Sequence, residues 1–452
     1  MAYRRTRIDH PIFSSFGAAM IYRLRQVLDI GFLIGLVFAL FLAGKIVPYL
    51  IVVGVIPIAV FWQKSDYVRP SSELKRFLLP TLGYFAFSLC LLYAYPGLPP
   101  GEKPPGNPNL ELYAVALALL AVGFLRGQQI RHISRLFHAV VPPSLLAAFA
   151  VLSAYMFLGI DRCRVRVEAA WPFIPAVIFA TLTFLLLLGW ATRPRWQRYM
   201  RLVFVALSIV VSLAYTGSRG VAVGQFAVLA GFMLLQGLPK FRSGLPTFKE
   251  FSISIAAGLA LSILVADVTG CGSLSRWPAL LDVIKNAQLT EFVTPAQAAP
   301  VAPSVTAGHQ IPKAVTDLST DASINLRLDM WRASLEAIRQ APIFGHGALS
   351  LRPIIQNRFG FEHNHNQYLA WLVTGGIVFL AMGLLFMLTP VFVSKGMAAA
   401  DRAVIILSVT GLWGGSMMFD AFLNLDFYLH YFSLLLGVLF ALTADAKEKQ
   451  GS

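Results

Sequence analysis

The sequence predicts an all-α, polytopic membrane protein with about twelve transmembrane helices and one long helical loop outside the membrane. Hydrophobic residues make up 57% of the 452 residues and charged residues only 13%, which is more apolar surface than a soluble protein of this length needs. The apolar residues gather in runs of ~17–25, the length that crosses a bilayer as a helix. One long polar stretch, residues 269–364, separates the last three runs from the others.

The predicted spans divide the chain into three parts. Residues 1–268 hold spans one to nine, residues 269–364 form the outer loop, and residues 365–452 hold spans ten to twelve with a C-terminal tail. The first two spans are separated only by Gly44-Lys45, which leaves the count open by one. The runs lie at residues 28–44, 46–62, 77–95, 109–125, 137–160, 170–191, 200–216, 220–237, 251–268, 367–393, 403–419 and 425–443.

Lysine and arginine gather in alternate loops, and this asymmetry predicts the orientation in the membrane. The basic loops, which we expect in the cytoplasm with both termini, are 64–76, 126–135, 193–201 and 240–249. The loops that then face the outside are 96–108, 217–220 and 269–364. The net charge of +15 follows this topology. Because no nucleic-acid-binding module is recognisable, we expect no nucleic-acid partner.

One short outer loop, residues 161–166, departs from the sign pattern because it carries three arginines at alternate positions. In an extended segment these would share one face, and Arg164 at their centre could attract an anionic substrate or lipid head group. The alternative is that they reach the membrane interface with no role in chemistry. Cys163 in this loop and Cys271 both fall on the outer side; whether they form a disulfide stays open, because the sequence supplies no distance between them.

The long outer loop contains one segment with a helical pattern, residues 325–340. Its apolar positions recur at the spacing of one helix face, opposite a charged face. We therefore expect an amphipathic helix that lies on the bilayer or caps the bundle, with Asn325 as its N-cap. The apolar stripe consists of Met330, Trp331, Ser334, Leu335 and Ile338.

Arg327 would lie in the first turn of this helix, where a cation opposes the helix dipole. Helix stability does not explain it there, whereas an arginine at a helix N-terminus is well suited to bind phosphate. The alternative is a surface arginine beside an acidic partner. Arg332 and Arg339 have acidic residues three or four positions away, and they predict a solvated face of salt bridges.

The turn Gly217-Ser218-Arg219-Gly220 joins two spans at the outer side. Its glycines allow a tight backbone and the close approach of a ligand. Arg219 is the only charge between two long apolar runs. It could bind a second phosphate of the same ligand, or it could anchor the turn at the head groups.

A polar cluster begins the tenth span. An imidazole can accept a proton near neutral pH, so His365 could act as a general base, while Asn366 could orient it or hold a substrate hydroxyl. The alternative is a structural histidine bonded to a backbone carbonyl. His363 and His365 would share a face in an extended segment and could form a metal pair. No Asp-x-Asp pair accompanies them, and Asp420 with Asp426 is a weaker pair, so metal-independent chemistry is favoured.

The motifs, taken in chain order, resemble the O-antigen ligase and polymerase superfamily of bacterial envelopes. The long outer loop fits this resemblance, which covers the topology throughout and the specific motifs over about residues 215–380. The motifs are Ser218-Arg219-Gly220, Arg327-x-x-x-Trp331, Pro342-x-x-Gly345-His346-Gly347, His365-Asn366-Gln367-Tyr368-Leu369 and Gly375-Gly376.

The resemblance implies a glycosyltransferase-C-like enzyme of the bacterial inner membrane with its active site facing the periplasm, surrounded by membrane lipids and needing no cofactor or metal. Its donor would be an undecaprenyl-diphosphate-linked O-antigen, and a ligase would transfer the glycan with inversion to a sugar hydroxyl of the lipid A-core. On this chain, Arg219 and Arg327 would bind the donor diphosphate and His365 would be the base. The further substrate-binding candidates are Ser218, Asn366, His363 and Arg164.

Other functions remain open at this point. An O-antigen polymerase or a protein O-oligosaccharyltransferase of the same superfamily would share the donor site and differ in the acceptor. The single compact outer loop favours a ligase. A transporter of lipid-linked glycans is disfavoured, because the spans are nearly free of charge and show no internal repeat.

Overall fold

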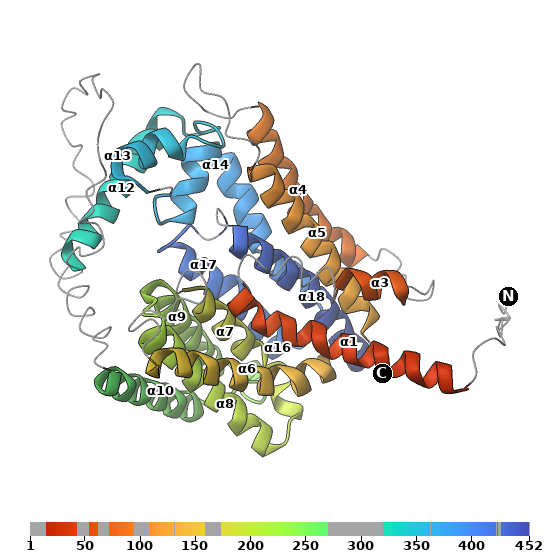
Figure 1. Ribbon diagram of the computed structural model, residues 1–452. Helices are drawn as coiled ribbons and strands as arrows, with labels where there is room; N and C mark the ends of the chain where they lie inside the picture. The colour runs from red at the N-terminus through yellow and green to blue at the C-terminus, as the bar shows by residue number, and fades with distance from the viewer. Residues whose placement is uncertain are drawn as a thin grey trace.

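The structure is a computed structural model, and its described residues are helical with no strand among them (Figure 1). It describes residues 15–42, 54–61, 72–94, 108–130, 132–158, 173–269, 320–361, 363–421, 423 and 426–451. The helices before the outer loop are α1 Ser15–Leu42, α3 Ile56–Val60, α4 Ser72–Ala94, α5 Pro108–Gln129, α6 Ile133–Phe157, α7 Phe173–Leu185, α8 Arg195–Val210, α9 Arg219–Gln236 and α10 Phe248–Thr269. Those after it are α12 Thr320–Gln340, α13 Asn357–Phe359, α14 Gln367–Met387, α15 Thr389–Val393, α16 Ala399–Ile405, α17 Leu412–Met417 and α18 Asp426–Gly451.

Seven helical segments within the described residues are long and apolar enough to cross a membrane. They confirm the all-α, polytopic architecture, while the total of twelve spans stays a prediction; the second predicted span lies mostly outside the described residues. The seven segments are Leu112–Gln129, Ile133–Phe157, Arg195–Tyr215, Arg219–Gln236, Phe248–Thr269, Gln367–Met387 and Tyr428–Asp445.

Contacts at the two ends of the segment from α16 to α17 define two ends of the bundle. At one end, a Cβ added to Gly220 would lie 2.7 Å from Phe419 Cβ, so the turn before α9 packs against the segment after α17. At the other end, the Gly189 amide donates to Asp401 Oδ1 at 2.7 Å. We call these the site end and the opposite end. Which of them faces the periplasm stays a prediction.

The amphipathic helix of the outer loop begins earlier than predicted. α12 starts at Thr320, so Asn325 lies inside the helix and is not its N-cap, and Arg327 lies beyond the first turn. Thr320 and Asp321 are residue types that favour a helix start, which explains the earlier boundary. The prediction that Arg327 sits at a helix N-terminus was therefore wrong, and any anion site there depends on its side chain.

α12 caps the site end of the bundle beside α14 (Figure 1). Its buried face is formed by Met330, Ser334 and Ala337, of which the apolar members pack in one cluster with Ala370 and Val373 of α14. Of the predicted stripe, Leu335 is 40% exposed, because the buried face is rotated toward Ala337. The predicted salt-bridge face is confirmed by the exposed pairs Arg332–Asp329 (3.2 Å) and Arg339–Glu336 (3.6 Å).

A break in α14 explains two of the sequence motifs. Gly375 and Gly376 leave helical geometry, and Gly376 has φ +64°, a conformation that favours glycine. The break frees two amides and two carbonyls of the helix, and the loop 342–347 bonds all four. Ile377 and Val378 donate to Pro342 O (2.9 Å) and Ile343 O (3.4 Å), while Val373 O and Thr374 O accept from His346 and Gly347 (both 2.8 Å). The cap is thus joined to α14 through backbone hydrogen bonds.

Candidate functional site

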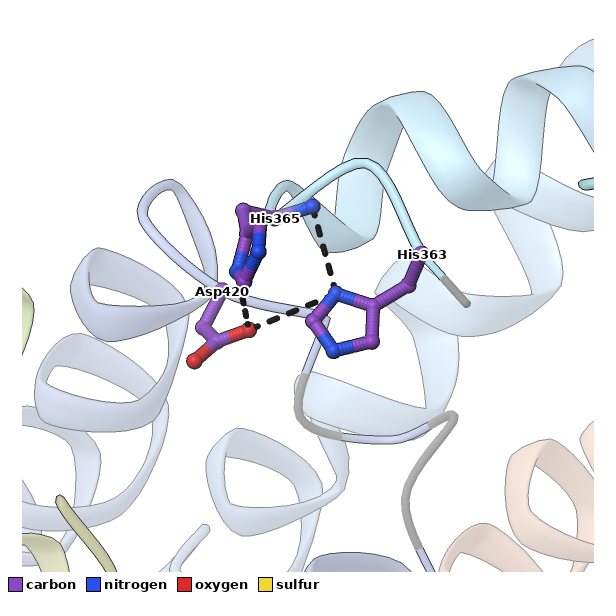
Figure 2. A group of neighbouring side chains, drawn as sticks. All are labelled: His363, His365 and Asp420. Atoms are coloured by element: carbon purple, nitrogen blue, oxygen red, sulfur yellow. Dashed lines mark hydrogen bonds and ion pairs between the residues drawn. The ribbon is translucent and has the colours of Figure 1, made fainter. Parts of the chain in front are cut away.

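Three titratable side chains converge just before α14 (Figure 2). His365 Nδ1 lies 3.3 Å from Asp420 Oδ1, and His363 Nδ1 lies 3.6 Å from the same oxygen. The backbone amide of His365 donates to His363 Nδ1 at 3.3 Å. The two histidines come from the segment between the cap and α14, and Asp420 comes from the turn after α17. The site therefore joins the segment after α12 to the turn after α17.

Asp420 is positioned by hydrogen bonds that tie its turn to the start of α14. The buried Gln367 accepts from the Leu423 amide through Oε1 at 2.7 Å. Asn366 caps α14 by accepting from the Leu369 amide at 3.1 Å, and its Nδ2 donates to Met418 O at 3.2 Å. Both ends of the Asn366 amide are thus bonded to backbone, so this residue supports the site rather than presenting an open side chain.

The histidines are positioned from the other side by α12. Trp331 Nε1 donates to Asn364 O at 2.9 Å, and Asn364 Nδ2 donates to Ser334 Oγ at 3.0 Å. Asn364 is fully buried. Because it stands between the two histidines, its side chain and backbone fix the direction in which both imidazoles leave the chain.

The backbone at His365 is itself unusual. Its φ is +52°, in the left-handed region that a non-glycine residue seldom occupies. Such a conformation costs roughly 1–3 kcal/mol and persists where the surroundings determine it. At His365 the bonds of Asn364 and Asn366 on either side supply that determination. Strain of this kind concentrates at functional sites.

The charges at the site favour a carboxylate beside neutral imidazole. Burial raises the pKa of Asp420, but the His365 hydrogen bond and the charges of the histidines and Arg327 outweigh it, and the pKa is lowered overall. Burial lowers the pKa of His363 to about 4, so this imidazole is neutral at pH 7. Burial also lowers the pKa of Arg327, while the charge of Asp420 opposes this. Arg327 therefore lies within electrostatic reach of the cluster.

The structure brings four of the candidate residues to one place, and it places the backbone of Arg219 next to the contact between Gly220 and Phe419. Arg327, His363, His365 and Asp420 interact directly or through their charges. Arg219 begins α9, one residue before the Gly220 contact with Phe419, whose neighbour is Asp420.

Two other predicted site residues are not among these four. Ser218 is buried, and its amide donates to Ser212 O at 2.9 Å. Arg164 lies outside the described residues, as do Cys163 and Cys271.

Sequence reasoning identified Asp420 only as half of a weak acidic pair with Asp426. The structure pairs Asp420 with the histidines instead, of which His365 is 55 residues away in the chain. Asn364 and Gln367 were missed as supports, although both lie within the polar cluster that drew attention to His365. The sequence feature that could have identified them is their position at the start of an apolar helix, where polar side chains tend to be buried.

The fold and site define a multi-pass helical membrane protein whose polar site is at one end of the bundle and contains an Asp–His pair beside an arginine. Comparison with known proteins shows what one segment of the chain is similar to. Residues 204–385 carry a domain that matches the family described as O-Antigen ligase. This confirms the resemblance to the O-antigen ligase superfamily and supports a transferase.

The matched range includes Arg219, Arg327, His363 and His365, but ends before Asp420. An uncharacterised protein of Haemophilus influenzae is 24% identical over 356 residues, which cover 76% of this chain and 78% of that protein.

Proposed function

We propose that this protein is an O-antigen ligase, which transfers a glycan from undecaprenyl diphosphate to a sugar hydroxyl of the lipid A-core. The observation that carries the proposal is the His365 Nδ1–Asp420 Oδ1 pair, 3.3 Å apart, with Arg327 within electrostatic reach. It lies at one end of a membrane bundle, mostly within a segment that matches the O-antigen ligase family. We place this end in the periplasm of a bacterial inner membrane, where lipid-linked donor and acceptor meet.

His365 acts as the general base in this proposal. A carboxylate only accepts hydrogen bonds, so Asp420 holds the proton of His365 on Nδ1 and leaves Nε2 as the proton acceptor. Nε2 takes the proton of the acceptor hydroxyl while the oxygen of that hydroxyl forms a bond to the anomeric carbon of the donor. The bond from that carbon to the diphosphate breaks, and undecaprenyl diphosphate leaves with inversion. The proton on Nε2 then passes to solvent or to the departing diphosphate.

The donor diphosphate is held by Arg327 and Arg219. A guanidinium carries a permanent charge and a planar set of donors that matches phosphate oxygens, so it stabilises the leaving group without a metal. The position of Arg219 one residue from the Phe419 contact supports this pairing. The energy for transfer is stored in the lipid-linked donor, so the proposed reaction needs no nucleotide or other cofactor.

The test is transfer by purified full-length protein mixed with undecaprenyl-diphosphate-linked glycan and lipid A-core, in excess EDTA and without nucleotide. We expect a glycan-extended lipid A-core, and we expect His365→Ala to abolish it while leaving donor binding largely intact. His132→Asn, at an exposed histidine that immediately precedes α6, is the matched control and should retain wild-type transfer.

Other products would contradict the ligase proposal. Longer lipid-linked glycan without lipid A-core modification would identify a polymerase. Transfer of glycan to serine or threonine would identify a protein O-oligosaccharyltransferase. Movement of the donor across the membrane of a vesicle, with no covalent product, would identify a transporter.

A further inference from the structure

We propose that a divalent transition-metal ion of the Zn²⁺ class binds between His363, His365 and Asp420 and inhibits the protein when bound. The binding site stands on geometry alone. The inhibition rests on the proposed function, because it acts on the proposed base.

The nitrogen and oxygen atoms that would bind the metal are separated by distances that suit a tetrahedral ion. Zn²⁺ bonds of 2.0–2.1 Å in a tetrahedron place neighbouring ligand atoms about 3.3–3.4 Å apart. The distances from Asp420 Oδ1 to the Nδ1 atoms of His365 and His363 are 3.3 and 3.6 Å. One ligand atom from each of the three residues lies within 4.8 Å of the others. A small rotation of the imidazoles would therefore complete three sites of a tetrahedron.

The direction of the hydrogen bond at His363 also favours a bound cation. His363 Nδ1 accepts from the His365 amide, so in this state it carries a lone pair and no proton. It nevertheless faces Asp420 Oδ1, which is also an acceptor, at 3.6 Å. Two acceptors that face each other repel unless a cation stands between them. A metal ion converts this contact into two favourable bonds.

The three side chains are accessible to an ion and are held in place by their surroundings. The side chains of His363, His365 and Asp420 are 13%, 17% and 7% exposed, so the ligands are held by packing but remain reachable. Asn364 and Gln367 fix the two segments that carry them, which reduces the cost of ordering a metal site. Two imidazoles and one carboxylate are ligands that zinc accepts while leaving a fourth position for water.

Arg327 opposes the bound cation, because its charge already acts on Asp420 and His363. The site should therefore bind less tightly than a structural zinc site. The direction of this effect can be tested, because removing the Arg327 charge should strengthen metal binding, although it should weaken donor binding.

Inhibition follows from the tautomer of His365. Free His365 keeps its proton on Nδ1, toward Asp420, and Nε2 accepts the proton of the acceptor hydroxyl. A metal on Nδ1 selects the neutral tautomer that carries its proton on Nε2. The imidazole then has no lone pair to act as base, and Asp420 is occupied by the metal. No oxidation or net proton loss from the imidazole is required.

The binding test uses Co²⁺ as a spectroscopic probe for Zn²⁺, with full-length protein in detergent and no polyhistidine tag. We expect the intense visible absorption of four-coordinate Co²⁺, which Zn²⁺ bleaches by displacement. His363→Ala should weaken Co²⁺ binding by roughly 100-fold, since even loss of an outer partner costs 10–100-fold in metal sites. Arg327→Gln should tighten it by about tenfold, whereas His132→Asn should bind like wild type.

Absorption typical of six-coordinate Co²⁺, or a four-coordinate signal that survives His363→Ala, would overturn the site. In the EDTA-free transfer assay, Zn²⁺ should reduce turnover at least tenfold, and EDTA should restore it. Turnover that rises with Zn²⁺ would overturn the inhibition and also the metal-independent mechanism. Because the Co²⁺ titration needs no substrate, failure of the transferase proposal would leave the result on metal binding intact.

Discussion

Asp401 and Asp420 stand near the two ends of the same helical segment, α16 to α17, and their surroundings differ. Asp401, at the opposite end, accepts the Gly189 amide at 2.7 Å and lies within electrostatic reach of Arg193 and Arg201. Asp420, at the site end, faces two imidazoles and Arg327.

Both carboxylates join segments distant in the chain, so joining segments alone does not indicate catalysis. The difference lies in the partners. A backbone amide and a guanidinium do not act as acids or bases near pH 7, whereas an imidazole does. We therefore infer a structural role for Asp401, while the chemical role of Asp420 belongs to the proposed function.

The largest expected effect tests this comparison directly. Asp420→Asn places an amide beside His365, which no longer favours the tautomer with the proton on Nδ1. Turnover should therefore fall roughly 10³-fold with the fold retained. Asp401→Asn keeps an oxygen for the Gly189 amide, so it should cost about 1 kcal/mol of stability and leave turnover within about twofold. Transfer rates and thermal unfolding of both variants decide it. Similar losses of turnover would remove the distinction between the two ends.

Arg327 allows a sharper comparison within one helix. Arg327→Lys keeps the charge but loses the planar set of donors, so kcat/KM should fall about 30-fold or more. Arg332→Lys, on the exposed salt-bridge face of α12, should change kcat/KM by less than about twofold. Steady-state kinetics with varied donor concentration gives both values. Equal tolerance at the two positions would show that α12 contributes only bulk positive charge.

The smallest of the three effects concerns positioning. Trp331→Phe removes the bond to Asn364 O but keeps an aromatic ring, so kcat should fall about tenfold while the KM for donor changes less than about twofold. Trp196→Phe, at a tryptophan that is 62% exposed near the opposite end, is the control. An effect of Trp331→Phe on thermal stability alone, with kcat unchanged, would mean that this contact supports the fold and not the direction of His365.

The sequence predicted the membrane class and the helices well because both depend on local composition and periodicity. It also predicted Arg327 and His365 as chemical residues, since charged or titratable groups are costly beside apolar spans. The structure places both near Asp420, and their chemical roles stay a proposal. It could not predict the pairing of His365 with Asp420, which depends on how α14 and the turn after α17 meet. The start of α12 was misplaced because Asn325 is a good cap by type, and residue type alone does not exclude an earlier start.

The motifs Pro342-x-x-Gly345-His346-Gly347 and Gly375-Gly376 were recognised without their physical meaning. Only the structure shows that they are two halves of one contact. A Cβ on Gly376 would lie 2.2 Å from Ile343 O, and one on Gly345 would lie 2.6 Å from Gly375 N. Pattern reasoning along a chain cannot detect such a contact, because each glycine is explained by the backbone of the other segment.

This contact also constrains how the protein is made. Until the loop 342–347 docks, the amides of Ile377 and Val378 and two carbonyls of α14 lack partners within an otherwise apolar helix. An unsatisfied backbone group costs several kcal/mol in hydrocarbon, so α14 cannot settle in the bilayer with this break before the preceding loop has docked. Docking of the loop and completion of the helix are thereby coupled during folding.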